Sequence, residues 1–356
     1  MKFIESTLRA CHLLLILCTF VSYLSAWTRP QEMWFVQFVG MLYPWLLLGN
    51  IIFILLWIRL KKRYYWLSIA TIILGWSHFS HFVGWSILDG STTGFRLKIL
   101  TYNIDNFACF YEKENGTKHV QALEKFIKEE NPDIICLQEA FITSEEYDTR
   151  LKKFPCLAAY PYILHPTEKA IVILSKIAPT QHANIPMEVG INYSANGANF
   201  ADFKINNKTI RLIVAHLQSN SVRETTQSIV DKPTLKDEDT QNGIKDIFRR
   251  IRNCSFYRAK QAEMIKVFIK KSPYPVLVVG DFNDTPQSYT YAQIADNLQD
   301  AFAKKGFGLG ITYGGIVPAL RIDYILASPS LPILSHRIFK KEYSDHYPIV
   351  AELGIE

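Results

Sequence analysis

The sequence lacks several patterns that define common protein classes. Its 356 residues include six cysteines but no Cys-x-x-Cys pair, and they contain no internal repeat and no low-complexity segment. Hydrophobic residues occupy 49% of the positions and aromatic residues 13%, which excludes an intrinsically disordered chain. The net charge of +6 is mild. It suits a polyanionic substrate or a membrane surface, and it argues against a protein dedicated to coating DNA.

Long hydrophobic runs are concentrated in the first ninety residues. Three apolar stretches, at 10–27, 34–60 and 64–88, each approach or exceed the about 20 residues that span a bilayer as a helix. Three such runs are implausible in the core of a soluble domain, and a cleaved signal peptide would explain only the first. We therefore expect residues 1–90 to form a membrane anchor with about three transmembrane helices, followed by a linker at 91–95.

Basic residues predict the orientation of this anchor. The segment RLKKR at 59–63 separates the second and third stretches, and Lys2 and Arg9 precede or begin the first. The loop on the other side has only Arg29, which Glu32 balances. The positive-inside rule places the N-terminus and the 59–63 loop in the cytoplasm. Three crossings then leave the rest of the chain outside the cytoplasm.

From residue 96 onward the sequence alternates between strand and helix patterns. The expected strands cover residues 97–104, 134–138, 170–174, 199–205, 209–215, 276–279, 321–327 and 349–352. Helices are expected at 118–130 and 243–270, with a short helix after Pro286. The pair Asn206 and Asn207 is a hairpin turn signal between two of the strands. This mixture indicates an α/β sandwich with mixed sheets.

Polar side chains gather at the ends of these expected strands. They are Asn103 and Asp105, Gln138 and Glu139, His216, Asp281 and Asn283, Asp323, and Asp345 and His346. A single case would be read as a turn, but Glu and His are not preferred turn residues. Six such segments therefore predict one polar site where several strands end.

The residue types in this set narrow its chemistry. Carboxylate and amide oxygens suit a hard cation such as Mg²⁺. The sequence has no His-Glu-x-x-His zinc motif and no serine nucleophile elbow. Histidines and carboxylates beside a hard metal are typical of metal-assisted phosphoryl hydrolysis.

The motifs TYNI, LQE, AHLQS, GDFND, RIDYI and SDHYPI occur in this order over residues 96–356. In this order they resemble the endonuclease/exonuclease/phosphatase superfamily, which has the deoxyribonuclease I-like fold. The preceding helices resemble the anchor of a membrane-bound bacterial branch, which implies a multi-pass protein of the bacterial inner membrane with its catalytic domain at 96–356 on the periplasmic or extracellular side. The resemblance also implies a four-layer α/β sandwich, two mixed β-sheets flanked by helices, that hydrolyses phosphodiesters or phosphomonoesters with Mg²⁺ or Mn²⁺.

The resemblance also assigns expected roles to the metal ligands and the residues around the water. Glu139 would be the principal metal ligand, with Asn103 beside it and Asp345 at the metal edge. Asp281 would orient or deprotonate the attacking water. Asn283 would hold the phosphoryl group.

The resemblance also implies roles for two histidines and one aspartate. His216 and His346 would donate hydrogen bonds to phosphate oxygens and stabilise the growing charge. Asp323 would orient His216.

Three further residues are candidates for substrate binding. Glu168 precedes a strand where some relatives keep an acid that pairs with the final histidine; the alternative is an exposed loop acid. Arg258 falls on the apolar stripe of the helix at 243–270, where a charge needs a partner, so it either contacts substrate phosphate or forms a structural salt bridge. Tyr313 is a candidate for the pocket wall. The polar insert at 220–243 is a candidate lid or specificity loop.

The fold does not select the substrate. Membrane tethering favours a phosphoester at the surface, either a nucleic acid or a phospholipid head group, so nuclease and phospholipid phosphodiesterase both stay open. No obligate protein partner is expected. The alternative from a different class is a catalytically silent phosphate- or lipid-binding module, but every expected motif residue is present.

Overall fold

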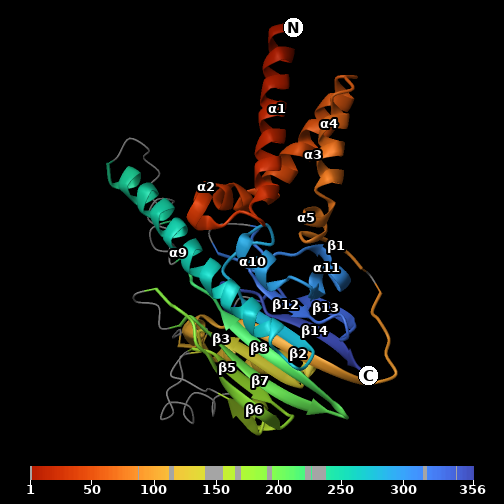
Figure 1. The fold of residues 1–356 in the computed structure, drawn as a ribbon, viewed down its shortest axis with the longest axis vertical. Helices are drawn as coiled ribbons and strands as arrows, with labels where there is room; N and C mark the ends of the chain where they lie inside the picture. The colour runs from red at the N-terminus through yellow and green to blue at the C-terminus, as the bar shows by residue number, and fades with distance from the viewer. Residues whose placement is uncertain are drawn as a thin grey trace.

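The computed structural model describes most of the chain. The described residues are 2–86, 88–111, 116–140, 155–164, 170–190, 195–220, 226, 238–315, 319–341 and 343–356. Figure 1 shows a group of helices from the N-terminal part of the chain standing on a sandwich of strands and helices.

The N-terminal region consists of short and long helices and one short strand. They are α1 (Lys2–Leu24), α2 (Pro30–Met41), α3 (Tyr43–Arg59), α4 (Tyr65–Leu74), α5 (Trp76–Ser80) and β1 (Val83–Trp85). Among the described helices, Phe3–Leu24 is long and apolar enough to cross a membrane by itself. Helices α2 and α3 pass the same test only as a pair, which is bent by 50°.

The expected third apolar helix at 64–88 is divided in the structure into α4, α5 and β1. The division begins at Gly75, where α4 meets α1 so closely that a Cβ atom would lie 2.1 Å from the ring of Tyr23. Beyond α5, Val83–Trp85 pairs antiparallel with Phe307–Leu309 (β11) of the sandwich. The end of the apolar stretch is therefore committed to the catalytic part of the chain.

The first six-stranded sheet has the order β13-β14-β2-β3-β5-β4. Its strands are β2 (Phe95–Asn103), β3 (Ile134–Gln138), β4 (Tyr162–Leu164), β5 (Val172–Ser175), β13 (Ile333–Ile338) and β14 (Ile349–Ile355). Strands β2 and β3 are parallel, and Asn103 is paired with Gln138 at their carboxyl ends.

The second six-stranded sheet has the order β10-β12-β9-β8-β7-β6. Its strands are β6 (Pro179–Ile185), β7 (Gly197–Ile205), β8 (Lys208–His216), β9 (Val276–Asp281), β10 (Gln299–Asp300) and β12 (Asp323–Ala327). Strands β8 and β9 are parallel, with His216 opposite Asp281, while β12 runs antiparallel and places Asp323 opposite Asp281 on the other side.

Helices cover the outer faces of the two sheets, so the structure has four layers. They are α6 (Gly116–Glu130), α9 (Glu238–Lys270), α10 (Tyr289–Ile294) and α11 (Ala301–Lys305), with 3₁₀ helices η1 (Asp105–Tyr111) and η2 (Pro155–Ala159). Alternate residues of β8 show how the layers form: Leu212 and Val214 belong to the core between the sheets, whereas Ile213 and Ala215 pack in the core that includes residues of α9. The expected four-layer α/β sandwich is confirmed.

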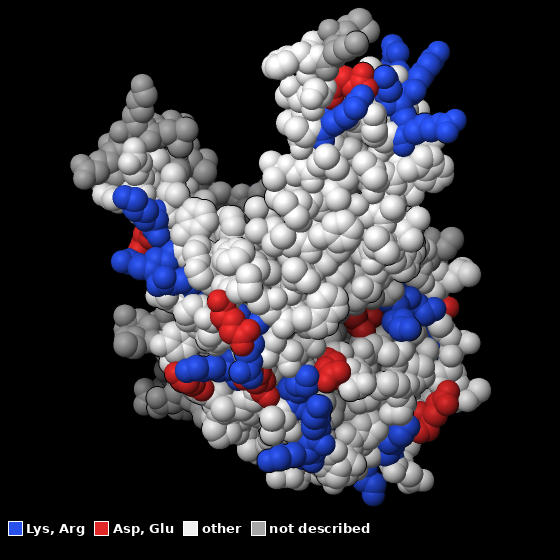
Figure 2. Space-filling model, turned by 45° about the horizontal axis from the view of Figure 1, so that its top comes forward, with Lys and Arg blue, Asp and Glu red and all other residues white. Residues whose placement is uncertain are grey.

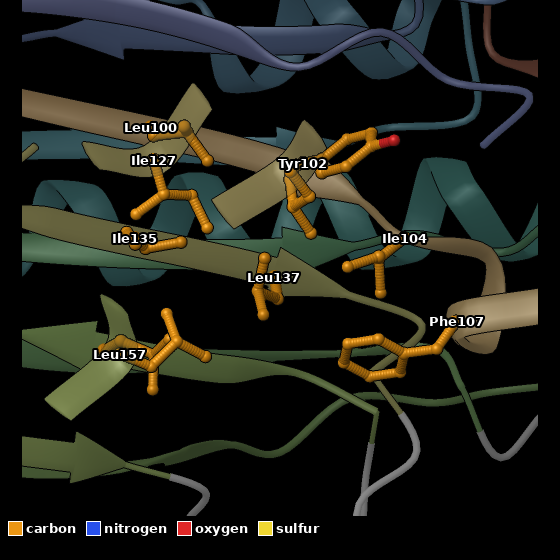
Figure 3. Close-up of a pocket in the computed structure, with 10 residues that line it drawn as sticks. Leu100, Tyr102, Ile104, Phe107, Ile127, Ile135, Leu137 and Leu157 are labelled. Carbon is orange, nitrogen blue, oxygen red and sulfur yellow. The ribbon is translucent and has the colours of Figure 1, made fainter. Parts of the chain in front are cut away.

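A small apolar cavity lies in the outer layer on the α6 side of the first sheet. Its volume is about 20 Å³, and Figure 3 shows leucine, isoleucine and aromatic side chains around it, including Leu100 and Tyr102 from β2 and Leu137 from β3. A space of this size holds about one water molecule, and an apolar lining gives water no partners. The cavity is a packing gap of the core.

Candidate active site

Parallel pairing brings the polar strand ends to one edge of the sandwich. Asn103 ends β2, Glu139 follows β3, His216 ends β8 and Asp281 ends β9. The Asn103 amide nitrogen donates to Asp281 Oδ2 at 3.0 Å and to Glu139 Oε1 at 3.2 Å, which joins the two sheets. His216 Nε2 lies 3.4 Å from Glu139 Oε1 and 3.6 Å from Asp281 Oδ2. The predicted polar site is therefore assembled from both sheets.

A tight turn aims Asp281 and Asn283 into this site. Gly280 has φ +129°, and a Cβ there would lie 2.0 Å from the carbonyl oxygen of Ala215, so only glycine fits. Asp281 Oδ1 accepts from the backbone N–H of Asn283 at 2.8 Å, and the Asn283 amide donates to Leu217 O at 3.1 Å. Asn283 itself has φ +52°. The turn and the site are thus one feature, in which backbone strain fixes the directions of two polar side chains.

Asp323 contacts the second histidine, so the expectation that it orients His216 is wrong. Its Oδ2 lies 3.0 Å from His346 Nδ1, and both residues are buried. The reason is the strand order: β9 lies between β12 and β8, so Asp281 separates Asp323 from His216. Nδ1 of His216 instead lies 3.0 Å from the carbonyl oxygen of Ala195.

Burial and charge act together on the Asp323–His346 pair. Burial raises the pKa of Asp323; His346 opposes this rise and the Asp281 carboxylate adds to it. Burial alone would lower the pKa of His346, but the carboxylates of Asp323 and Asp281 outweigh it and raise the pKa above its ordinary value. The pair therefore favours a protonated His346 whose Nε2, 3.7 Å from Asp281 Oδ2, is a charged hydrogen-bond donor.

The donor set fits a hard divalent cation. Glu139 and Asp281 provide carboxylate oxygens, the ligand type that Mg²⁺ and Mn²⁺ prefer. The Asn103 amide turns its nitrogen toward these carboxylates, and its oxygen accepts from the backbone N–H of Asp105 at 3.1 Å. One oxygen each from Asp281 and Asp323 and one nitrogen of His346 lie within 4.8 Å of one another.

An orphaned atom in the same place points to a further occupant. Nε2 of His216 is buried and makes no hydrogen bond to any residue that the structure describes. A buried polar atom without a partner is costly, and this one faces two carboxylates. His216 Nε2 is therefore available as a hydrogen-bond donor to an acceptor such as a phosphoryl oxygen.

Sequence reasoning missed two residues that hold the others in place. Thr312 Oγ1 accepts from the backbone N–H groups of Ile322 and Asp323, at 3.0 and 3.1 Å. Ser344 Oγ donates to Asn103 O at 2.8 Å and accepts from His346 N at 3.1 Å. Ser344 is the first residue of the SDHYPI motif and Thr312 precedes the candidate Tyr313, so the sequence marked their positions but not their roles.

Two of the three substrate-binding candidates lie among the described residues. The Tyr313 ring packs edge-on against His346, with centroids 5.1 Å apart, so it forms part of the site wall. Arg258 is buried: it pairs with Asp284 at 3.1 Å and donates to Gln218 O at 2.8 Å. These contacts support the salt-bridge alternative, and a substrate contact of Arg258 stays a prediction.

The third candidate, Glu168, lies outside the described residues. The candidate lid at 220–243 is described only at 220, 226 and 238–243. Their predicted roles stay predictions.

The chain belongs to the endonuclease/exonuclease/phosphatase family, whose sequence profile matches residues 100–346. Membership confirms the prediction that the protein is a phosphoric ester hydrolase. Residues 5–82 match a domain of unknown function, DUF8431. No curated protein matches the chain.

Two solved structures illustrate the shared fold. The first is D. rerio TDP2 complexed with single strand DNA product, at 16% identity and a TM-score of 0.51, over 73% of this chain and 99% of that chain. The second is a functionally unknown conserved protein from Enterococcus faecalis V583, at 16% identity and a TM-score of 0.52, over 73% of this chain and 100% of that chain. At such low identity the likeness concerns the fold.

Proposed function

We propose that the protein is a membrane-anchored, divalent-metal-dependent phosphodiesterase that acts on a phosphoester substrate outside the cytoplasm. The observation that carries this proposal is the convergence of Asn103, Glu139, His216 and His346 on Asp281 or its neighbours, with polar atoms 3.0 to 3.7 Å apart, at the edge of the sandwich. The site combines a base, two donors for phosphoryl oxygens and a set of oxygen ligands.

The chain's own residues divide the work of hydrolysis. Asp281 orients the attacking water and accepts its proton, and its geometry is fixed by Asn103 and Asn283. His216 and His346 donate to the phosphoryl oxygens as negative charge grows there, and Asp323 keeps His346 protonated and oriented.

Glu139, Asn103 and Asp345 are the residues that would hold Mg²⁺ or Mn²⁺. When bound, the cation supplies positive charge that neutralises the phosphate and positions it. Asn283 would hold the phosphoryl group from the side of the β9 turn.

The surface of the N-terminal region supports membrane anchoring. Leu13, Leu17, Leu55 and Ile73 are each more than half exposed although they are apolar. Exposed apolar surfaces of this extent indicate contact with lipid or another partner. Figure 2 shows Lys and Arg gathered at the far tip of the helices and an uncharged surface below that tip.

The same tip supports the proposed topology. Lys62, from the loop between α3 and α4, pairs with Glu5 of α1 at 3.0 Å, so the start of the chain and the basic loop lie together. The other ends of α1 and α3, and the chain after α5, lie next to the sandwich (Figure 1). If α1, the bent pair α2 and α3, and α4 with α5 each crossed the bilayer with the basic tip in the cytoplasm, the sandwich would lie on the periplasmic side of a bacterial inner membrane. A reporter fused after Glu356 that is active only in the cytoplasm would contradict this orientation.

A nucleic acid is one candidate substrate class, and one solved structure of similar fold holds a single strand DNA product. A phospholipid head group is the other class that the anchor would bring within reach. Both contain the phosphodiester that the proposed chemistry requires.

The test is hydrolysis by the full-length chain in detergent with Mg²⁺ or Mn²⁺. The panel contains plasmid DNA, RNA, phospholipids and bis-p-nitrophenyl phosphate. Asp281→Ala and His346→Ala run beside the wild type, with His182→Ala as the matched control, because His182 is exposed on β6.

We expect activity that needs the metal, disappears in Asp281→Ala and His346→Ala, and survives in His182→Ala. The preferred panel member identifies the substrate class. A folded, metal-binding wild type with no turnover on any panel member would instead support a phosphate- or lipid-binding module.

A further inference from the structure

The segment that leaves the active site runs directly into the N-terminal helical region. After Asp281 and Asn283, the chain enters a connection at 284–288 that leads to α10. Gln287 and Ser288 in this connection are buried, as is Tyr289 at the start of α10. Figure 1 shows α10 next to α2. The connection that follows the proposed base is therefore covered by the anchor.

Hydrogen bonds join this connection and the first residue of α10 to the anchor. The hydroxyl of Ser25, at the corner between α1 and α2, lies within hydrogen-bonding distance of the carbonyl oxygens of Gln287 and Ser22 and has one proton for the two. The backbone N–H of Tyr289 donates to the side-chain oxygen of Gln37 at 3.1 Å. The Gln287 amide donates to His78 O at 3.4 Å. Two of these bonds involve backbone groups of this segment, so they restrict its path.

The corner that supplies these groups is itself closely held. The Gln37 amide nitrogen donates to Ser25 O at 2.8 Å and to Thr28 O at 2.7 Å, so both ends of this side chain are in use. Gly40 lets α2 approach: a Cβ there would lie 2.4 Å from Ser25 Oγ and 3.6 Å from the side chain of Gln287. Ser25 is fully buried and Gln37 is 9% exposed, so neither group can exchange its partner for bulk water.

A second contact supports the opposite side of the site. Strand β1 pairs with β11, and the backbone N–H of Gly310 donates to Phe82 O at 3.1 Å. Two residues later, Thr312 accepts from the backbone N–H of Asp323, the partner of His346. The anchor thus braces both segments that align the reacting groups.

We infer that the N-terminal helical region is a working part of the active site, and that Ser25 and Gln37 are positioning residues for hydrolysis that act through the connection at 284–288. This inference deepens the proposed phosphodiesterase and rests on it. A displacement of about 1 Å at a reacting group can cost up to about 100-fold in rate, so a clamp on the segment that carries Asp281 has leverage over kcat.

The test uses the full-length chain in detergent and compares Ser25→Ala/Gln37→Leu with Asn50→Leu. The control makes the same change from amide to Leu as Gln37→Leu in the same region: the buried Asn50 amide bonds to Thr19 Oγ1 and Leu46 O, within the helices. Two readouts are taken at matched folded fraction. They are hydrogen–deuterium exchange of the amides at 281–289, and kcat and KM on bis-p-nitrophenyl phosphate.

We expect exchange at 281–289 to be at least about tenfold faster in the double variant, with kcat reduced about tenfold and KM little changed. Asn50→Leu should change neither. Unchanged exchange at 281–289, or equal changes in the control, would overturn the inference. Faster exchange with normal kcat would overturn the positioning role. If the wild type has no activity but the exchange at 281–289 still differs between the variants, the proposed phosphodiesterase activity is wrong, while the structural contact between the anchor and the connection at 284–288 is supported. If the double variant does not fold, Ser25→Ala alone is read in the same way.

Discussion

The helical region and the sandwich differ in the hydrogen bonding of particular buried polar side chains. In the helices, one buried polar network is closed: Trp57 Nε1 donates to His12 Nδ1 at 3.0 Å, and His12 Nε2 lies 2.7 Å from Ser68 Oγ. The Tyr43 hydroxyl and Asn50 Oδ1 of the same region are buried without a hydrogen bond to a described residue. In the sandwich, His216 Nε2 is buried beside two carboxylates without a hydrogen bond to a described residue. A closed polar network stabilises a structure, whereas an incomplete one marks a place for a ligand.

The two regions also differ in where their apolar side chains are. The sandwich has three large clusters of buried hydrophobic residues, while the cluster within the helical region has only Tyr23, Tyr43, Leu47 and Phe82 as buried members. The helices leave much of their apolar surface exposed. The sandwich can therefore be stabilised by its own core, whereas the helices bury less apolar surface among themselves.

The largest difference between the two regions is expected in kcat when the proposed catalytic base is replaced. We expect Asp281→Asn to lower kcat by about 10²–10⁴, because the amide cannot accept the proton of the water. Asn50→Leu, which removes a buried amide in the helical region, should leave kcat of the folded protein unchanged. Steady-state kinetics on bis-p-nitrophenyl phosphate measure both. Equal losses would show that the division between a structural and a catalytic polar network is wrong.

The strained turn behind the base gives the next largest effect, this time on stability. Gly280→Ala places a Cβ 2.0 Å from Ala215 O at a φ of +129° and should cost more than about 3 kcal/mol. The matched control is Gly308→Ala, where φ is +76° but no atom lies within 4 Å of the added Cβ. We expect the control to cost about 1 kcal/mol. Chemical denaturation midpoints measure the difference, and similar midpoints would contradict the packing argument.

A third prediction concerns the loss of stability at acidic pH that the buried His336 causes, away from the candidate active site. Burial lowers the pKa of His336 on β13 to about 4, from an ordinary value of 6.5. Between these values the unfolded chain binds a proton that the folded chain does not, so stability is full above about pH 6.5 and falls as the pH drops to 4. The total loss is about 3 kcal/mol.

His336→Leu should remove most of this acid sensitivity, which denaturation curves between pH 7 and pH 4 can measure. His182→Ala, at an exposed position of β6, is the control that should keep it. A pH dependence that is identical in His336→Leu and wild type would locate the acid-sensitive group elsewhere.

The smallest effect is expected inside the helical network. Trp57→Phe keeps the aromatic packing and removes the donor to His12, which should cost about 1 kcal/mol. Thermal unfolding of the full-length chain in detergent measures this cost, and Trp66→Phe, at an exposed position of α4, is the control. A loss as large as that of Gly280→Ala would show that the helical network is more strongly coupled to the sandwich than its local bonds indicate.

Local patterns in the sequence predicted much of the fold. The strand expected at 134–138 coincides with β3, and Asn206, with φ +54°, turns the hairpin between β7 and β8 as its residue type indicates. Strand β6 was missed because its sequence, PTQHANI, is largely exposed and lacks the apolar alternation that marks a half-buried strand. Long strands with buried faces carry their own signal, and edge strands do not.

The sequence by itself determined which residue types stand at the strand ends, because those positions follow from local hydrophobic patterns and turn formers. Only the tertiary structure decided which of them touch. The strand order places Asp323 in contact with His346. The packing of α9 places Arg258 in contact with Asp284, and the docking of α2 places Gln37 in contact with Tyr289 after the connection at 284–288. Such contacts join residues tens or hundreds of positions apart, and they are set by register and packing, which no local pattern encodes.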